Sequence, residues 1–118
     1  MVDAFLDAWN KAEQIHGWLE IPEAYMLWKH RGKWCEIGCW KGRSTLILAE
    51  SGCEGWAIDW GKGSPEHGRG VDNRKELATN LAVYSNVHLL HERFEDVADK
   101  VPDGLNLLHL DAEHLHLL

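Results

Sequence analysis

Residues 34–45 read WCEIGCWKGRST, an apolar run that enters a turn bracketed by Gly38 and Gly42 and continues into a helix-compatible segment. This order brings a ligand against a helix N-terminus, where unpaired backbone N–H groups point outward. The turn reads E-x-G-x-x-x-G, which differs from the G-x-G-x-x-G fingerprint of dinucleotide-binding proteins. Glu36, just before the turn, would repel a pyrophosphate and attract a ligand that carries an ammonium group.

A second short apolar run, residues 55–59, ends in the carboxylate of Asp59, twenty-one positions after Gly38. In open α/β sheets an acid at this spacing binds ribose hydroxyls off the carboxyl end of a strand. Asp59 therefore predicts a ribose contact without choosing a cofactor. Trp60 follows and offers an aromatic face for an adenine ring, with plain packing as the alternative. We expect Trp40, in the glycine turn, to be partly exposed near the ligand.

Composition and charge exclude several classes of protein. The chain has 118 residues, enough for one domain over residues 1–118, and a formal net charge of -7. That charge argues against nonspecific binding to nucleic acid or to an anionic membrane. No apolar run approaches the roughly 20 residues that span a bilayer. The N-terminus lacks the pattern of a secretory signal, and the three cysteines are odd in number, so we expect a cytoplasmic location with free thiols.

Short apolar runs alternate with helical patterns along the chain. The predicted strands cover residues 33–37, 55–59, 86–90 and 105–110, and the predicted helices cover residues 3–16, 22–32, 43–50, 73–85 and 94–101. This alternation is typical of parallel sheets with helical crossovers. The sequence therefore predicts an α/β fold, a Rossmann-like parallel sheet with flanking helices, preceded by a helical N-terminal extension over residues 1–32.

The segment EIGCWKGRST, residues 36–45, resembles the first motif of class I S-adenosylmethionine-dependent methyltransferases. It is closest to the branch that reads E-I-G-x-x-x-G-R-S-T, which includes many sugar and natural-product O-methyltransferases. The pattern G-W-L-x-x-x-E-A-x-x-L, from Gly17 onward, also resembles what precedes the motif in that branch.

The resemblance implies S-adenosylmethionine as the cofactor, with its methionine end wrapped by the glycine turn and its ribose held by Asp59. Phe94 stands where the family usually has a residue that hydrogen-bonds the adenine edge, and a phenyl ring can only stack there. The cofactor-binding residues implied in this way are Glu36, Gly38, Cys39, Trp40, Gly42, Ser44, Asp59, Trp60 and Phe94.

The segment from Leu108 to His114 resembles the family's D-x-x-H segment, whose Asp and His face the transferred methyl group. The resemblance implies Asp111 and His114 as catalytic residues, and a histidine is a credible base for a hydroxyl that is being methylated. In members that use a divalent cation such as Mg, the aspartate is a metal ligand, which makes Asp111 the candidate here.

The family pattern continues beyond this segment with a helix, a fifth strand and an antiparallel pair, so we expect the sheet to be incomplete at its C-terminal side. Either the chain is a fragment, or a homo-oligomer completes the open sheet edge. The expected function is O-methylation of a small-molecule or sugar acceptor. The alternative is a binding or scaffold protein that keeps the cofactor fold without catalysis. A nicotinamide-dependent oxidoreductase is disfavoured by the loop pattern.

Overall fold

The computed structural model describes residues 2–60 and 72–110, in which helices and strands alternate as the sequence predicts. Within these two stretches, no helix is long and apolar enough to cross a membrane. The elements are α1 (Val2–Ala12), α2 (Ile21–Lys29), β1 (Trp34–Ile37), α3 (Arg43–Glu50), β2 (Gly55–Ile58), α4 (Arg74–Leu81), β3 (Val87–Leu90), α5 (Phe94–Val97), the 3₁₀ turn η2 (Ala98–Lys100) and β4 (Leu107–Leu110).

The strands form one parallel sheet in the order β3-β2-β1-β4. The chain thus moves outward from β1 through β2 to β3 and then returns to place β4 on the other side of β1. A reversal of this kind is a topological switch point, and open α/β sheets bind ligands in the crevice beyond it. The carboxyl ends of β1 and β4 flank this crevice. The predicted Rossmann-like fold is confirmed.

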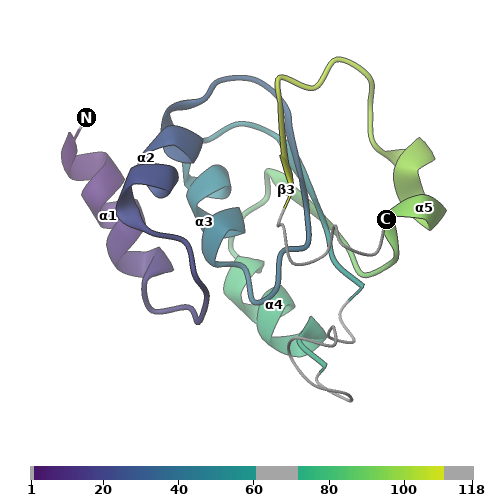
Figure 1. Cartoon of the computed structure of the whole chain (residues 1–118), viewed down its shortest axis with the longest axis horizontal. Coiled ribbons are helices and arrows are strands. Elements are labelled where there is room, and N and C mark those ends of the chain that lie inside the picture. The colour runs from purple at the N-terminus through teal and green to yellow at the C-terminus, as the bar shows by residue number, and fades with distance from the viewer. Residues whose placement is uncertain (1, 61–71, 111–118) are drawn as a thin grey trace.

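The helices divide unequally between the two faces of the sheet. In Figure 1, α1, α2 and α3 lie on one side of the strands and α5 lies on the other. α3 contacts β2, while α1 and α2 pack against α3. Side chains of β1 alternate accordingly: Trp34 belongs to the larger core with the N-terminal helices, and Cys35 belongs to a smaller core with Val97.

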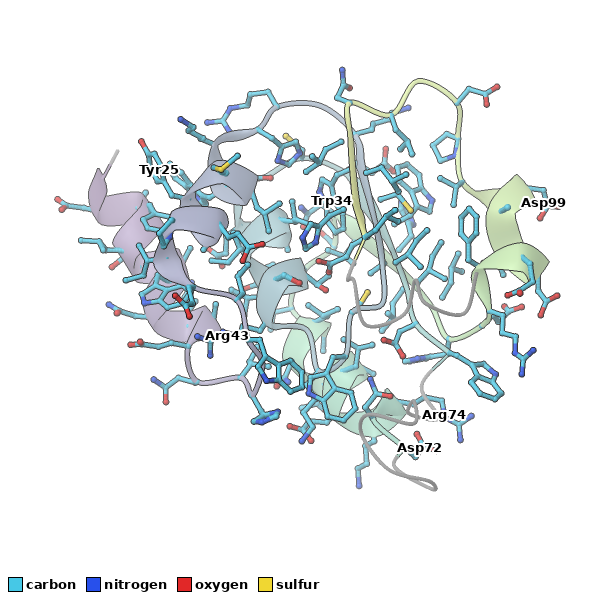
Figure 2. The ribbon with its side chains drawn as sticks, in the orientation of Figure 1. Tyr25, Trp34, Arg43, Asp72, Arg74 and Asp99 are labelled. Atoms are coloured by element: carbon cyan, nitrogen blue, oxygen red, sulfur yellow. The ribbon has the colours of Figure 1, made fainter. Side chains whose placement is uncertain are left out.

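Trp34 explains the glycine that starts β2. Its indole ring is fully buried near the centre of the molecule (Figure 2) and lies over Gly55, its partner in the parallel register. A Cβ atom at Gly55 would overlap the indole ring. The indole Nε1 donates to the carbonyl of Cys53 at 3.0 Å, which satisfies the one polar atom of the buried ring.

The predicted helix over residues 43–50 matches α3, whereas the first helix and the helix after β2 end earlier than the periodicity predicts. α1 stops at Ala12 because residues 13–20 turn back over the glycine loop as a connecting segment, hereafter the α1–α2 linker. Their carbonyls are used by a side chain from α3 instead of by a continuing helix.

β4 forms one edge of the described sheet, and its outer face is thinly covered. Leu108 pairs with Cys35, which belongs to the smaller core with Val97. Leu108 and Leu110 remain 52 % and 39 % exposed. The opposite face of the same strand carries His109, which is part-buried beside β1.

Candidate functional site

The glycine turn adopts a backbone that its glycines permit. Gly38 and Gly42 have φ values of 86° and 101°, and Trp40 between them has a φ of 53°. The N–H of Gly42 donates to the carbonyl of Cys39 at 2.9 Å, and the N–H of Leu46 donates to the carbonyl of Gly42 at 2.8 Å to begin α3. A positive φ is costly for a residue with a Cβ. The strain at Trp40 must therefore be offset by contacts that hold this loop.

Asp59 and Asn73 provide such contacts from the side of β2. The Asp59 carboxylate accepts from the backbone N–H of Trp40 at 2.8 Å and from the Asn73 amide at 3.5 Å. The same Asn73 Nδ2 donates to the carbonyl of Trp40. Both peptide groups that flank the strained residue are thus bound by buried side chains, so the predicted ribose-binding acid also fixes the loop.

Glu36 lies beneath the loop and is fully buried. One carboxylate oxygen, Oε2, accepts from Ser44 Oγ at 2.5 Å and faces His109 Nδ1 at 2.6 Å, and the other oxygen accepts from Thr45 Oγ1. These donors offset the cost of burying the carboxylate. Direct contact between Glu36 and an ammonium group would require Ser44, Thr45 or His109 to move away from the carboxylate. The role predicted for Glu36 therefore stays a prediction, with this rearrangement as its condition.

The α1–α2 linker covers the loop from above. Trp40 Nε1 donates to His16 Nδ1 at 3.1 Å, and the ring of Trp18 lies 6.4 Å from that of Trp40. The prediction that Trp40 is partly exposed is wrong, because this cover leaves its side chain only 8 % exposed. An N-terminal segment that closes over the turn was not foreseen from the turn itself.

Arg43, the first residue of α3, fastens the linker in place. Its guanidinium donates to the carbonyls of Ile15 and Leu19 at 3.0 Å each and to that of Glu13 at 3.4 Å. Its Cζ lies 4.9 Å from the ring of Trp9 in α1. Figure 2 shows Arg43 between α3 and the N-terminal segment. Arg43, although it belongs to the quoted motif, thus binds the protein's own backbone.

A cavity of about 230 Å³ lies between the linker, the glycine turn and the end of β4. It stands at the switch point of the sheet, where a ligand is expected. Its walls combine aromatic rings, one carboxylate and two polar side chains that also contact Glu36. The lining residues are His16, Gly17, Trp18, Leu19, Glu23, Cys39, Trp40, Arg43, Ser44, His109 and Leu110.

Two thiols near the site, those of Cys35 and Cys39, are unreactive at neutral pH. Burial raises the pKa of the Cys39 thiol well above its usual value, and the charges of Glu36 and Asp59 add to the rise. Burial, with a further contribution from Glu36, raises the pKa of Cys35 to about 11. Neither is a nucleophile at neutral pH, since the thiolate is the reactive form. Cys39 contributes to the cavity wall as a small apolar side chain.

The structure brings only part of the predicted set into the cavity. Cys39, Trp40 and Ser44 line it. Trp60 and Phe94 are partly exposed and are not among its lining residues, and the Arg93 guanidinium lies 4.3 Å from the ring of Trp60. Their adenine-stacking roles stay predictions.

Asp111 and His114 lie outside the described residues, so their predicted roles are not addressed by the geometry. Among the residues that the structure does describe, no group of three or more His, Cys, Asp and Glu side chains is arranged to hold a metal ion. The predicted divalent cation thus has no support from the described part of the site.

The residues at the site that were missed from the sequence include His16, Thr45, Asn73 and His109. Thr45 was within reach, because it is the last letter of the quoted motif and follows Ser44 on the same helix. The β1–β4 register pairs Glu36 with His109, but that register depends on a return of the chain across about 70 residues. Asn73 and His16 come from segments with no motif of their own.

Comparisons with known proteins agree with this architecture. A family model described as a methyltransferase domain matches residues 35–116. The crystal structure of cofactor-bound Rv0187 from MTB superposes with a TM-score of 0.61 at 20 % identity over 93 % of this chain and 52 % of that one. The SAH-bound Podospora anserina methyltransferase PaMTH1 superposes with a TM-score of 0.63 at 18 % identity over 92 % of this chain and 50 % of its own.

The chain therefore spans about half the length of these two solved structures. At this level of identity their likeness establishes the shared fold alone. A search of curated proteins found no match.

Proposed function

The chain belongs to the methyltransferase-domain family, and from that premise we propose that it is an S-adenosylmethionine-dependent methyltransferase that O-methylates a small-molecule acceptor. The observation that carries the proposal is the position of the glycine turn. Gly38 to Gly42 curve over a buried carboxylate at the switch point of the sheet, beside the cavity described above. The finer choice of an oxygen acceptor follows from the resemblance of residues 36–45 to the O-methyltransferase branch.

The described residues fit the ribose of such a cofactor at one specific atom. Asn73 is 2 % exposed, and its buried Oδ1 has no hydrogen-bond donor among the residues that the structure describes. Its Nδ2 already faces the oxygens of Trp40 and Asp59, so the orientation of the amide is determined. A buried acceptor without a donor costs about 1–3 kcal/mol. A ribose hydroxyl beside Asp59 would supply the missing donor.

The cofactor would supply an electrophilic methyl group on a sulfonium centre, and the protein's contribution is alignment and exclusion of water. Trp18, Trp40 and the α1–α2 linker cover the cavity and would keep water from it. Glu23, on the cavity wall, offers a carboxylate to an ammonium group that Glu36 does not reach directly. The resemblance gives the proton-accepting role to His114 and a catalytic role to Asp111, and both stay predictions.

Isothermal titration with S-adenosylhomocysteine tests the cofactor assignment independently of the acceptor. We expect binding of this ligand and none of NAD. Gly42→Ala should abolish or strongly weaken binding, because the residue has a φ of 101° and a Cβ there would lie 3.1 Å from Leu77. Gly104→Ala is the matched control, with a φ of 81° in open space away from the turn. Heat with NAD and none with S-adenosylhomocysteine would end the methyltransferase proposal.

A further inference from the structure

A buried carboxylate and an imidazole meet at the switch point of the sheet. Glu36 on β1 and His109 on β4 are partners in the parallel register, so their side chains leave the same face of neighbouring strands. Glu36 Oε2 and His109 Nδ1 are 2.6 Å apart, and the histidine side chain is 23 % exposed against 0 % for the glutamate. Glu36 is therefore the buried member of the pair, and His109 is the member nearer to the surface.

The hydrogen bonds around Glu36 determine which ring nitrogen carries the proton. Ser44 and Thr45 direct their hydroxyl hydrogens at the two carboxylate oxygens, so the carboxylate acts as an acceptor. The nitrogen that faces Oε2 must then be the donor. In the neutral ring this leaves Nδ1 protonated and places the lone pair on Nε2. A buried carboxylate that fixes a tautomer in this way is the arrangement by which histidine bases are oriented in hydrolases.

His109 also lines the cavity, together with Ser44 and Leu110. The charged or titratable side chains that line the same cavity are His16 and Glu23 from the N-terminal segment, Cys39 from the turn and Arg43 from α3. Arg43 is engaged with linker carbonyls and His16 with Trp40. Cys39 stays protonated because burial raises its pKa. Among the described titratable side chains that line the cavity, only His109 contacts the fully buried carboxylate of Glu36.

The chain contains a second histidine–carboxylate pair that serves as a comparison. His88 Nε2 lies 2.7 Å from Glu54 Oε2, but both side chains are nearly half exposed, and neither lines the cavity. Solvent can replace either partner there, so this pair does not hold a tautomer as firmly. The Glu36–His109 pair differs in burial and in position, not in composition.

We propose that His109 is the proton acceptor for the methylated hydroxyl and that Glu36 is the positioning residue that holds its ring, an inference that rests on the proposed function. The acceptor oxygen forms a bond to the methyl carbon as the carbon–sulfur bond breaks and leaves its electron pair on sulfur. The hydroxyl proton passes to His109 Nε2 and is later released to water. The substrate class is a hydroxylated small molecule that binds in the cavity lined by Trp18 and His109.

The first test reads the tautomer directly and needs no acceptor. Nitrogen NMR of the full chain with ¹⁵N-labelled histidine, assigned by comparison with His109→Gln, should show protonated Nδ1 and unprotonated Nε2 for His109. Glu36→Gln should shift the ring towards the Nε2–H form that is common in water. A proton on Nε2 of His109 in the wild type would overturn the proposal. The same tautomer in the wild type and in Glu36→Gln would also overturn it.

The second test separates this proposal from the assignment of the cofactor. His109→Gln keeps an amide donor for Glu36 and should bind S-adenosylhomocysteine within about twofold of wild type by titration. Absence of binding in the wild type would refute the proposed function. Binding combined with the wrong tautomer would refute the role of His109 alone.

The third test measures methyl transfer from S-adenosylmethionine to catechol and to glucose. His109→Gln should lower kcat by about 10²- to 10⁴-fold with little change in KM, the usual loss of a general base. His88→Gln is the control and should keep the wild-type rate. His114→Gln tests the competing base: a large loss there with wild-type kcat in His109→Gln would overturn the proposal. If neither probe is methylated, the tautomer measurement decides.

Discussion

The carboxylate of Asp59 accepts a hydrogen bond from the backbone N–H of Trp40 at 2.8 Å, which ties the end of β2 to the strained residue of the glycine turn. The acid is 6 % exposed, so water cannot replace it easily. The acid that the sequence predicts to bind a ribose therefore also holds the protein's own backbone.

Asp59→Ala should weaken binding of S-adenosylhomocysteine by roughly 1.5–3 kcal/mol, the range for hydrogen bonds to a charged group. It should also lower the free energy of unfolding by about 1–3 kcal/mol, because the buried N–H of Trp40 loses its acceptor. Titration and urea denaturation measure the two effects. Unchanged affinity in a folded Asp59→Ala protein would show that the acid serves the loop alone.

Arg43→Met should release the α1–α2 linker. The variant keeps the aliphatic stem but loses the guanidinium that donates to Glu13, Ile15 and Leu19. We expect the free energy of unfolding to fall by about 2–3 kcal/mol and protease cleavage to appear within residues 13–20. Arg74→Met is the control, since Arg74 pairs with Asp72 at the surface (Figure 2), where solvent screens the pair, and it should leave stability unchanged. Equal effects of the two variants would contradict the anchoring role.

The order of the helices and strands could be predicted from the sequence, since each helix and strand depends on a local pattern of residues. α3 and the turn before it follow from glycine spacing and helical periodicity, and the predicted strands of residues 33–37 and 55–59 contain β1 and β2 with at most one extra residue at an end. The contacts of Glu36 with His109 and of Arg43 with the α1–α2 linker were not predicted, because these partners lie far away in the sequence. Which distant segment meets a given side chain is set by packing and register, and one sequence carries no direct record of either.

Thiol chemistry should distinguish Cys53 from the two cysteines near the site. Cys53 is partly exposed, whereas the pKa of Cys35 is raised to about 11 and that of Cys39 is also raised, both mainly by burial. At pH 8 a disulfide reagent should modify Cys53 quickly, and it should modify Cys35 and Cys39 only at the rate of unfolding. Fast reaction at all three would show that the loop opens readily.

The same shifts set the sign of a pH effect on stability. A thiol whose pKa is higher in the folded state binds its proton more tightly there, so the folded state loses stability as the pH rises through the interval between the two values. For Cys35 the interval runs from 9.0 to about 11. Denaturation at pH 8, 9 and 10 should therefore show a falling free energy of unfolding above pH 9, and Cys35→Ala should flatten that decline. A slope that Cys35→Ala leaves unchanged would assign the decline to other groups.

Gly55→Ala should be far more damaging than Gly52→Ala. A Cβ at Gly55 would overlap the ring of Trp34, whereas Gly52 has open space around it and only a positive φ of 86°. We expect Gly52→Ala to cost about 1–2 kcal/mol and Gly55→Ala to cost 3 kcal/mol or more, beyond ordinary overpacking. Trp34→Leu combined with Gly55→Ala should recover part of the loss in thermal denaturation. Additive effects of the two changes would show that ring and strand do not meet.

Copies of the chain should associate with one another through β4. Leu108 is 52 % exposed and Leu110 is 39 % exposed. They lie on β4, which pairs with β1 and with no second strand among the described residues, and such an edge can pair with another strand. Light scattering should show a mass that rises with protein concentration. Leu108→Lys should suppress that rise, because a charged side chain on an edge strand disfavours pairing. Val83→Lys is the matched control, since Val83 is 83 % exposed but follows a helix instead of lying on the sheet edge. A mass independent of concentration, or equal suppression by both variants, would show that β4 is not the surface through which copies meet.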